Sequence, residues 1–535
     1  MIKRSFKLVN FKTKQEYIKM NPTYKLFQKG YLLVLVFLLA GIYGIQAQTI
    51  TYAEPSRSEN RQINFDIIGK YEDHYLIYKN YRNVNYISRY DQGMKLEENV
   101  ALPFLPERLT EVNFLAYPDF AYLFYQFNRR GIVYMNVVKI GPSGTPLTEP
   151  IELDTTHIGF GGDSKVYQVL ASEDKSKIAL LKVNTRNERN YYVTTLLYDN
   201  ALNLNHRSDL VLAMRQRNDF LTDFSLDNKG NVVFGKGTRI GNSDNISKFM
   251  MIVKPAAADS FLTDELSFEN ITLDGVKLKI DNYNNRYLFS SFFYGSRRTI
   301  IEGILNAIYD ADANSWVVNN AIPFTEEMRQ DARGKNNTRN AFNDYFIQDI
   351  AIRSDGAFMV NAESQYQTSR GGYNPYNRWN LYNPFMTGSY YYPWGVGGYG
   401  NPWNSWYSPY GGMNNMTRFN ADDIMVMAFS NEGRMILSNF VHKSQFDDYA
   451  DNAISFKTFN TGNGLHFLYN EFDRREFLLN YQTLTPDGKI VRNPSMKNLR
   501  PEFTLMNRYA KQVSINEMII PALYRNYMTF ALLKM

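Results

Sequence analysis

The chain has 535 residues, of which 44% are hydrophobic and 21% charged, so global disorder is excluded and two or three domains, or one large repeat domain, are possible. Of its 59 Lys and Arg and 53 Asp and Glu, eight and one fall in residues 1–47, which leaves 51 basic and 52 acidic residues. The body of the chain is therefore nearly neutral, and its charge gives no argument for nucleic-acid binding.

The first predicted element is a secretory leader. An apolar run at 31–43 follows Lys25 and Lys29 and precedes the sequence Gln46-Ala47-Gln48. A basic flank, a short apolar core and a small residue before a polar one are typical of a signal peptide, and we expect cleavage after Ala47. Met20 is an alternative start. An uncleaved anchor is the competing interpretation, but the run is shorter than the roughly 20 residues that span a bilayer.

The rest of the chain has the composition and pattern of short strands divided by turns. Aromatic residues make up 15%, with 40 Tyr and 36 Phe, and such residues suit half-buried sheet surfaces. The clearest unit runs through 113–117, 120–125, 132–140 and 150–153, with Pro118-Asp119 between the first two strands. Similar turns contain Asp, Asn and Gly because these residues close turns or adopt positive φ at little cost, as at 172–176, 225–230, 354–356, 430–433 and 485–488.

These units repeat with a regular spacing. Taking the first strand of each as a marker, they begin near residues 63, 113, 166, 219, 275, 344, 453 and 502. Repeats of this size, with about four strands each, are typical of an all-β fold, the β-propeller. The last unit is short, and 48–53 reads as a lone strand, so we expect the two ends to share one blade. Eight blades are favoured, seven are the runner-up, and an array of β-sandwiches is the structural alternative.

Two insertions interrupt the pattern. The first, at 325–338, is charged and has no apolar stripe, so we expect a partly helical, solvated linker. The second, at 371–416, contains four of the five tryptophans and one charged residue, Arg378. Because Tyr and Trp dominate interface hot spots, we interpret it as a docking loop for a protein, a glycan or a membrane interface. A loop that folds back on its own propeller is the alternative. The candidate partner-binding residues are Trp379, Tyr391, Trp394, Trp403, Trp406 and Tyr407.

No residue pattern announces a chemical reaction, and we predict no catalytic residue, no metal site and no cofactor. Cysteine is absent, which excludes disulfides, thiolate metal sites and a cysteine nucleophile. The glycine-rich stretch 159–163 lacks the context of a phosphate loop, and acidic loops show no EF-hand pattern. The five histidines lack the spacing of a helical zinc site and read as surface or core residues: His74, His157, His206, His442 and His466.

A glycosidase requires two carboxylates about 5–10 Å apart, which adjacent acids on solvated turns do not provide. We therefore read three acidic pairs as surface features: Glu326-Glu327, Asp422-Asp423 and Asp447-Asp448.

In its repeated strands and in turns such as Ser354-Asp-Gly356, the chain resembles exported bacterial β-propellers of the TolB-like and WD-repeat-like groups. It lacks the Gly-His and Trp-Asp signatures of true WD repeats. The Gln after Ala47 and the Asn- and Tyr-rich style are similar to secreted Bacteroidota proteins. The turns at 225–230 and 354–356 also resemble the Asp-box turns of sialidases, which in that family are structural.

Together these features favour a non-enzymatic β-propeller of the cell envelope, which serves as a scaffold or docking module for a protein partner. We expect it in the periplasm or at the outer membrane rather than free outside the cell. A carbohydrate-binding or glycoside-hydrolysing propeller is the alternative, because aromatic faces stack on sugar rings and propellers host glycosidases. No second long apolar run occurs, so no transmembrane helix is predicted in the mature chain.

Overall fold

The structure is a computed structural model, and it describes most of the chain from residue 48 onward. The described residues are 48–56, 63–158, 166–187, 189–214, 218–241, 245–295, 299–333, 340–369, 372–374, 418–448, 451–473, 476–496, 502–525 and 527–535. Contacts group Thr49–Lys534 into one compact unit. Among the described residues, no helix has the length and apolar character that crossing a membrane requires.

Four sheets share one plan, in which four antiparallel strands follow one another in chain order. The first comprises β2 (Asn64–Tyr71), β3 (His74–Tyr81), β4 (Val84–Tyr90) and β5 (Leu96–Ala101). The second comprises β6 (Glu111–Ala116), β7 (Ala121–Arg129), β8 (Ile132–Ile140) and β9 (Ile151–His157). The third comprises β10 (Tyr167–Ala171), β11 (Lys177–Asn187), β12 (Asn190–Asp199) and β13 (Leu204–Ala213). The fourth comprises β29 (Phe456–Asn460), β30 (Leu465–Asp473), β31 (Glu476–Leu484) and β32 (Ile490–Arg492).

A nine-stranded sheet contains two further runs of this kind. Its first run is β14 (Asp219–Leu226), β15 (Val232–Arg239), β16 (Ile246–Lys254) and β17 (Leu262–Leu266). Its second run is β19 (Lys277–Asp281), β20 (Arg286–Tyr294), β21 (Ile301–Asp310) and β22 (Ser315–Pro323). The two-residue strand β18 (Thr272–Leu273) pairs with both β16 and β20 and so joins the runs.

The two remaining sheets depart from the plan. A six-stranded sheet holds β23 (Tyr345–Ile352), β24 (Phe358–Ser369), β25 (Gly372–Asn374), β26 (Arg418–Phe429), β27 (Met435–Val441) and β28 (Gln445–Asp447). A five-stranded sheet holds β33 (Phe503–Leu505), β34 (Lys511–Ser514), β35 (Glu517–Tyr524), β36 (Tyr527–Lys534) and, from the other end of the chain, β1 (Thr49–Tyr52). As expected for the two ends, β1 pairs antiparallel with β36, from Thr49 opposite Lys534 to Tyr52 opposite Ala531.

The turns explain why the strands stop where they do. In five turns between strands, a glycine N–H donates to the carbonyl three residues earlier: Gly144, Gly230, Gly356, Gly433 and Gly488. All five have φ between 71° and 93°, a region that favours glycine. Lys175 occupies the same position in the turn after β10, with φ of 58°. A lysine there bears a steric cost that glycine avoids, so its side chain is a candidate for a specific role.

The core consists of apolar layers between consecutive sheets. One layer combines Tyr78 and Leu76 from the β2–β5 sheet with Phe114 and Leu123 from the β6–β9 sheet. Equivalent clusters lie between the following sheets. The sheet that contains both ends packs on the first sheet in the same way, with Phe530 in contact with Phe65 at a ring distance of 5.3 Å. Side chains of this size each stabilise by about 1.5–3 kcal/mol when fully buried.

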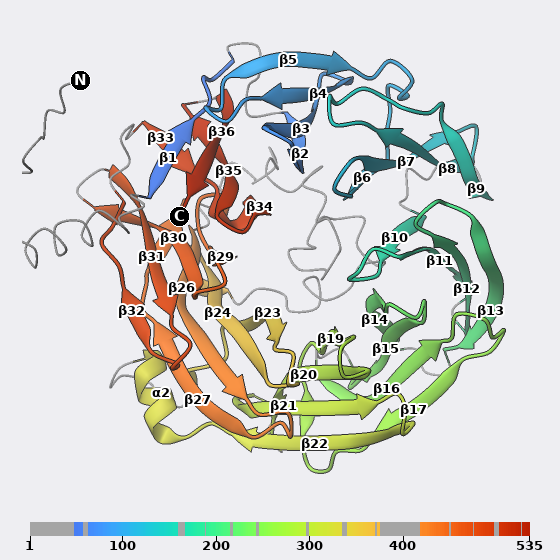
Figure 1. Ribbon diagram of the computed structural model, residues 1–535. Helices are drawn as coiled ribbons and strands as arrows, with labels where there is room; N and C mark the ends of the chain where they lie inside the picture. Colours follow the sequence, from blue (N-terminus) through green and yellow to red (C-terminus); the bar gives the residue numbers. More distant parts are fainter. Residues whose placement is uncertain are drawn as a thin grey trace, which may run out of the picture. The chain divides into compact units, whose positions relative to one another are not determined.

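Figure 1 shows these sheets following one another around a common centre. In each four-stranded run the first strand lies nearest the centre and the last at the rim. The unit is all-β with repeated antiparallel sheets, which is consistent with a β-propeller. Each observed inner strand, from β2 at Asn64 to β33 at Phe503, begins close to a predicted first strand.

The segment 325–338 is partly helical, as expected, and half of the side chains of its helix are exposed, but the helix also packs on the core. Residues Glu326–Arg333 form the helix α2, and Met328 and Ala332 are buried in a cluster with Phe324 and Phe342. These two residues are four positions apart and therefore lie on the same face of the helix. Two apolar side chains are thus enough to hold this short helix against the core. A further short 3₁₀ helix, η2, spans Asn507–Tyr509.

Candidate functional site

The six aromatic residues predicted to bind a partner lie outside the described residues, so their placement stays a prediction. The structure describes the strands that flank their segment: β24 ends at Ser369 and β26 begins at Arg418. We call β24 and β26, with the short strands β25 and β28 that pair with them, the stem.

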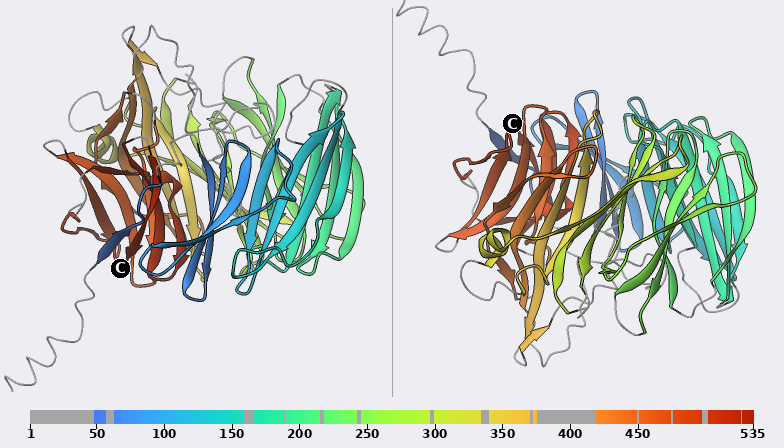
Figure 2. Two further views of the ribbon diagram at one scale, coloured as in Figure 1. Left: turned by 90° about the horizontal axis from the view of Figure 1, so that it is seen from above. Right: turned by 90° about the horizontal axis from the view of Figure 1, so that it is seen from below.

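The stem is a long antiparallel ladder. β24 and β26 have 12 residues each, which exceeds every other described strand. They pair from Phe358 opposite Phe429 to Thr368 opposite Arg418, with one register shift between Glu363 and Gln365. Figure 2 shows the yellow end of β24 and β25 extending past the ends of its neighbours at one face of the unit.

Side chains fasten the far end of this ladder. The Arg418 guanidinium donates to both oxygens of Asp448, at 2.6 and 3.1 Å, and lies 4.1 Å from the centroid of the Phe446 ring. The hydrogen bonds from Arg418 lower the pKa of Asp448. The Tyr366 hydroxyl donates to Asp422 Oδ2 at 2.9 Å, across the two long strands. A bidentate pair and a ring contact thus hold the first residue of β26 against β28 and the residue that follows it.

A buried ionic cluster forms around Glu363, in the middle of β24. Lys443 Nζ lies 2.7 Å from Glu363 Oε1 and also donates to Ala421 O at 2.8 Å and to Gln445 Oε1 at 2.7 Å. The Ser455 hydroxyl donates to Glu363 Oε2 at 2.5 Å. Burial lowers the pKa of Lys443, and the carboxylate of Glu363 opposes this shift. We call these residues the Lys443–Glu363 cluster.

The Lys443–Glu363 cluster is closed to water and to substrate, since the two charged side chains are 1% and 0% exposed. The cluster therefore holds the surrounding chain segments in position and is not accessible to a substrate. The backbone of Ser455 is also held in place, with a φ of 77° and an N–H that donates to Gln445 Oε1 at 2.9 Å. A strained backbone conformation persists only where its surroundings hold it in place. Here the hydrogen bonds of Ser455 to Glu363 and Gln445 hold the segment before β29 against the stem.

One of the three acidic pairs differs from the expectation of solvated surface residues. Asp422 and Asp423 lie on β26 and are half-buried. Asp422 accepts from Tyr366 and Ser444, and Asp423 accepts from the Lys443 N–H and from His442 Nδ1 at 3.0 Å. Successive side chains on a strand point to opposite faces of the sheet, so the two carboxylates have different hydrogen-bond partners. Both are held by hydrogen bonds and are not free surface acids. In the other two pairs, Glu326 and Glu327 are exposed on α2, and Asp448 binds Arg418.

The histidines behave as single residues. His74, His206 and His442 each lie within 3.1 Å of one carboxylate, and His466 is hydrogen-bonded to Thr461 and Thr483. Burial lowers the pKa of His466, which favours its neutral form. Within the described ranges, no three His, Asp or Glu side chains come together in a way that could hold a metal ion.

A second set of ionisable groups lies on the strands nearest the centre. Asp66 on β2 interacts with Lys511 on β34, whose Nζ donates to Ile67 O at 2.6 Å. Burial raises the pKa of Asp66 to about 6, and the Lys511 charge opposes the rise. Asp223 on β14 lies 4.0 Å from Lys277 on β19, and burial raises its pKa as well.

The same pairing recurs once more on the inner strands. Burial lowers the pKa of Lys457 on β29, while the charge of Asp349 on β23 opposes this shift. The Asp223–Lys277 pair joins the inner strands of the two runs within the nine-stranded sheet, and the Asp66–Lys511 and Asp349–Lys457 pairs join inner strands of neighbouring sheets. Lys175, whose strained turn was noted above, does the same with a hydrogen bond of 2.6 Å to Ala116 O. These groups hold inner strands together and are only partly exposed.

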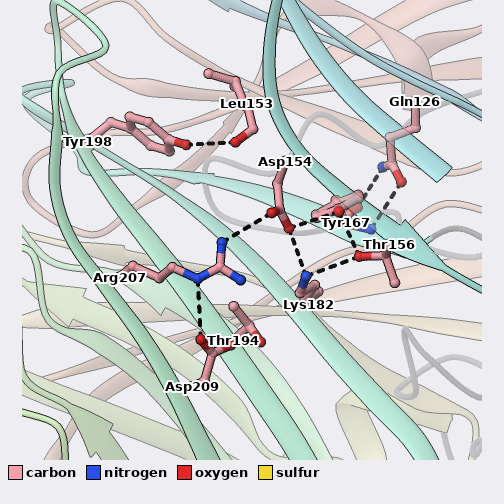
Figure 3. A network of polar contacts seen from close by, with 10 residues as sticks. All are labelled: Gln126, Leu153, Asp154, Thr156, Tyr167, Lys182, Thr194, Tyr198, Arg207 and Asp209. Carbon is pink, nitrogen blue, oxygen red and sulfur yellow. Dashed lines mark hydrogen bonds and ion pairs between the residues drawn. The ribbon is translucent and has the colours of Figure 1, made fainter. Parts of the chain in front are cut away.

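Figure 3 shows a third polar network, between the second and third sheets. Asp154 on β9 accepts from Lys182 at 2.7 Å, from Arg207 at 3.2 Å and from the Tyr167 hydroxyl at 2.9 Å. Arg207 also binds Asp209 at 3.2 Å. The hydrogen bonds from Lys182 and Tyr167 outweigh partial burial and lower the pKa of Asp154. Every charge in this network has an opposite charge beside it, as a structural interface requires.

Sequence reasoning identified neither the Lys443–Glu363 cluster nor the inner Asp–Lys pairs. A usable signal does exist for Glu363, because it is the single charged residue in the sequence of β24. A charge in such a context requires a partner when the strand is buried. The partner itself lies 80 residues away in the sequence and is found only from the fold.

Comparison with known proteins assigns no family to the chain. No protein-family model matches it, and no curated protein matches it. Among solved structures, prolyl oligopeptidase B from Galerina marginata is 8% identical, with 88% of this chain and 56% of that chain covered and a TM-score of 0.40. The chain thus spans about half the length of that peptidase.

Two other solved structures are also matched at low identity. An ulvan lyase, a polysaccharide lyase, is 10% identical, with 78% and 90% of the two chains covered and a TM-score of 0.36. A Synechocystis apocarotenoid oxygenase is 9% identical, with 92% and 94% covered and a TM-score of 0.32. At these values no activity carries over to this chain, and the resemblance to TolB-like and Bacteroidota proteins stays a prediction.

Proposed function

We propose that residues 48–535 form an eight-bladed β-propeller whose ring is closed by β1 on β36. The division of the nine-stranded sheet supports this count, because each side of β18 contains one complete four-stranded run. The hydrogen bond of 2.8 Å from the Ala53 N–H to Phe530 O extends the pairing of the two ends. With that pairing, the last sheet has the four-stranded depth of the others, and its outer strand comes from the opposite end of the chain.

The proposed role is that of a non-enzymatic docking module of the cell envelope, with a protein partner that binds the aromatic segment 371–416. The observation that carries this proposal is the stem. Its two 12-residue strands end in a bidentate Arg418–Asp448 pair and are anchored below by a fully buried ion pair. A segment rich in Tyr and Trp that starts and ends on a fixed ladder loses less entropy on binding than one on a free tether.

Export to the periplasm or to the outer membrane is the second part of the proposal. It rests on the leader pattern in residues 1–47 and on the absence of cysteine throughout the chain. Fractionation of the native cells, with N-terminal sequencing of the mature protein, tests both the location and cleavage after Ala47. Recovery of the intact leader in the inner membrane would contradict this part.

The docking role is tested by deletion of 371–416, with a short linker between the stem strands. Wild type and deletion variant are expressed in the native cells, crosslinked gently and purified by affinity. We expect the deletion to lose the wild-type partner and to keep its cooperative melt, because loop tips contribute little to the packing between sheets. Recovery of the wild type alone, or an unchanged partner on the deletion, would contradict the proposal.

The carbohydrate alternative predicts a different result in a parallel assay. Wild type but not the deletion would then bind a glycan array, since aromatic faces stack on sugar rings whether or not a protein partner is present. A glycan-positive and partner-negative outcome would replace the docking role with a carbohydrate-binding one.

A further inference from the structure

The outer strands of the described unit differ in how they discourage pairing with other chains. The last strand of a sheet presents backbone N–H and C=O groups that can accept another strand, and charges on that strand oppose this. β5 carries Glu97 and Glu98, β17 carries Asp264 and Glu265, and β32 is three residues long with Arg492. β9 and β13 carry acids and histidines as well.

β22 lacks this protection. It ends the nine-stranded sheet, pairs with β21 on one side, and has nine residues without a charge: Ser-Trp-Val-Val-Asn-Asn-Ala-Ile-Pro. Its exposure alternates along its whole length, and the exposed positions hold small, neutral side chains: Ser315, Val317, Asn319, Ala321 and Pro323. β27 is also uncharged, but α2 packs beside it.

The backbone of β22 leaves a regular stretch for pairing. A register shift falls near its start, between Ile308 and Tyr309 on the β21 side. Similar shifts occur at β5, β9, β13 and β27, so this one does not set β22 apart. Pro323 lacks an N–H at the other end. The residues between, Val318–Ile322, stay in continuous register with Ile308–Ile304.

We propose that β22 is a self-association edge, at which two copies of this chain pair their β22 strands antiparallel about a two-fold axis. This inference is independent of the docking role. A second copy is the occupant because β22 itself has the chemistry that the edge requires: an extended, uncharged strand with small exposed side chains. In an antiparallel self-pair each strand meets its own sequence, so a charged strand such as β5 would place like charges together, whereas β22 would not.

The test uses sedimentation velocity of the mature chain over a wide range of concentrations. The wild type is expected to form a dimer centred on Asn320, in which position 321 of one copy lies diagonally across the ladder from position 321 of the other. Ala321→Lys is expected to weaken that dimer by roughly tenfold or more, because the two lysines are then diagonal neighbours on the same face of a short ladder. Ala321 is exposed and small, so the variant retains its fold, which a thermal melt verifies. Val211→Lys, at an exposed position of β13, is the matched control and is expected to dimerise like the wild type.

A charge exchange completes the test. An equimolar mixture of Ala321→Lys and Ala321→Glu is expected to recover the dimer as a heterodimer, because opposite charges then lie on diagonal positions of the same sheet face across the edge. A wild type that stays monomeric at all concentrations overturns the proposal and leaves the strand of another protein as the remaining occupant. A dimer that Ala321→Lys does not weaken also overturns it, since the contact must then lie elsewhere.

Discussion

At the scale of single residues, charge inside the sheets is tolerated only where the fold supplies a partner. Lys443 and Glu363 are both buried, and the cost of removing each from water is offset only by the other and by hydrogen bonds from neighbours such as Ser455. A pair of this kind fixes geometry more than it adds stability. It is therefore most sensitive to the loss of one member.

The first prediction is that Lys443→Met destabilises the chain strongly, by about 3–5 kcal/mol, because Glu363 is left as an uncompensated buried charge. Denaturant unfolding followed by circular dichroism measures the change. The double variant Lys443→Met with Glu363→Gln should recover a large part of it. Arg353→Ala removes an exposed partner of Asp355 and serves as a control, with little change expected because an exposed ion pair contributes little to stability. Equal losses in both single variants would contradict this account.

The second prediction concerns Asp66. Its pKa in the folded chain is about 6, above the ordinary value of 3.8, so the folded state holds this proton more tightly than the unfolded state. Its contribution to stability is therefore complete below about pH 4 and is lost as pH rises through about 6. Asp66→Asn stays neutral throughout, so the wild type should lose stability relative to this variant across that window. Thermal melts of both proteins at a series of pH values test this, and parallel curves would contradict it.

At the scale of elements, a substitution at a turn glycine destabilises the fold in two ways: through backbone strain and through contacts of the added side chain. Gly433 and Gly462 both have positive φ, so alanine is strained at either position. A Cβ on Gly433 would lie 2.7 Å from Val318 Cγ1, whereas on Gly462 the nearest atom is 3.8 Å away.

The third prediction follows from that contrast. Gly462→Ala should cost about 1 kcal/mol from the backbone alone, and Gly433→Ala should cost roughly 1 kcal/mol more because Val318 must move. Denaturation midpoints of the two variants measure the difference. Equal midpoints would show that Val318 yields without cost.

The elements were also the most predictable part of the fold. First strands near 63 and 219 appear as β2 and β14, because alternation and turn residues are local signals. The helix α2 docks through Met328 and Ala332, which the sequence did not reveal because two small contacts make no stripe. The Asp349–Lys457 pair was equally hidden, since its members are brought together only when two sheets stack. The aromatic segment remains a prediction from composition.

At the scale of the whole molecule, the proposed ring depends on a strand that comes from the far end of the chain. β1 contributes four residues to the last sheet, and Ala53, which follows it, is buried against that sheet. Without β1, the backbone of β36 would be left as an open edge beside a large apolar core.

The fourth prediction is that a chain starting at Glu54 has a melting temperature roughly several degrees below that of a chain starting at Gln48, because it lacks the short strand that pairs with β36. It should also aggregate more readily, because β36 is exposed. Addition of a synthetic peptide with the sequence of residues 48–54 should restore part of the lost melting temperature in a concentration-dependent way. An unchanged melt in the shortened chain would show that β1 does not contribute to closure.

The pairing of β1 with β36 also sets how the unit responds to a pulling force. Because Thr49 lies opposite Lys534, the outgoing ends of both strands leave from the same end of the ladder. Tension applied between these ends loads the rungs one after another, as in an unzipping geometry, rather than all at once in shear. The pairing of β1 with β36 should thus be the first strand pair to separate in single-molecule extension of the unit.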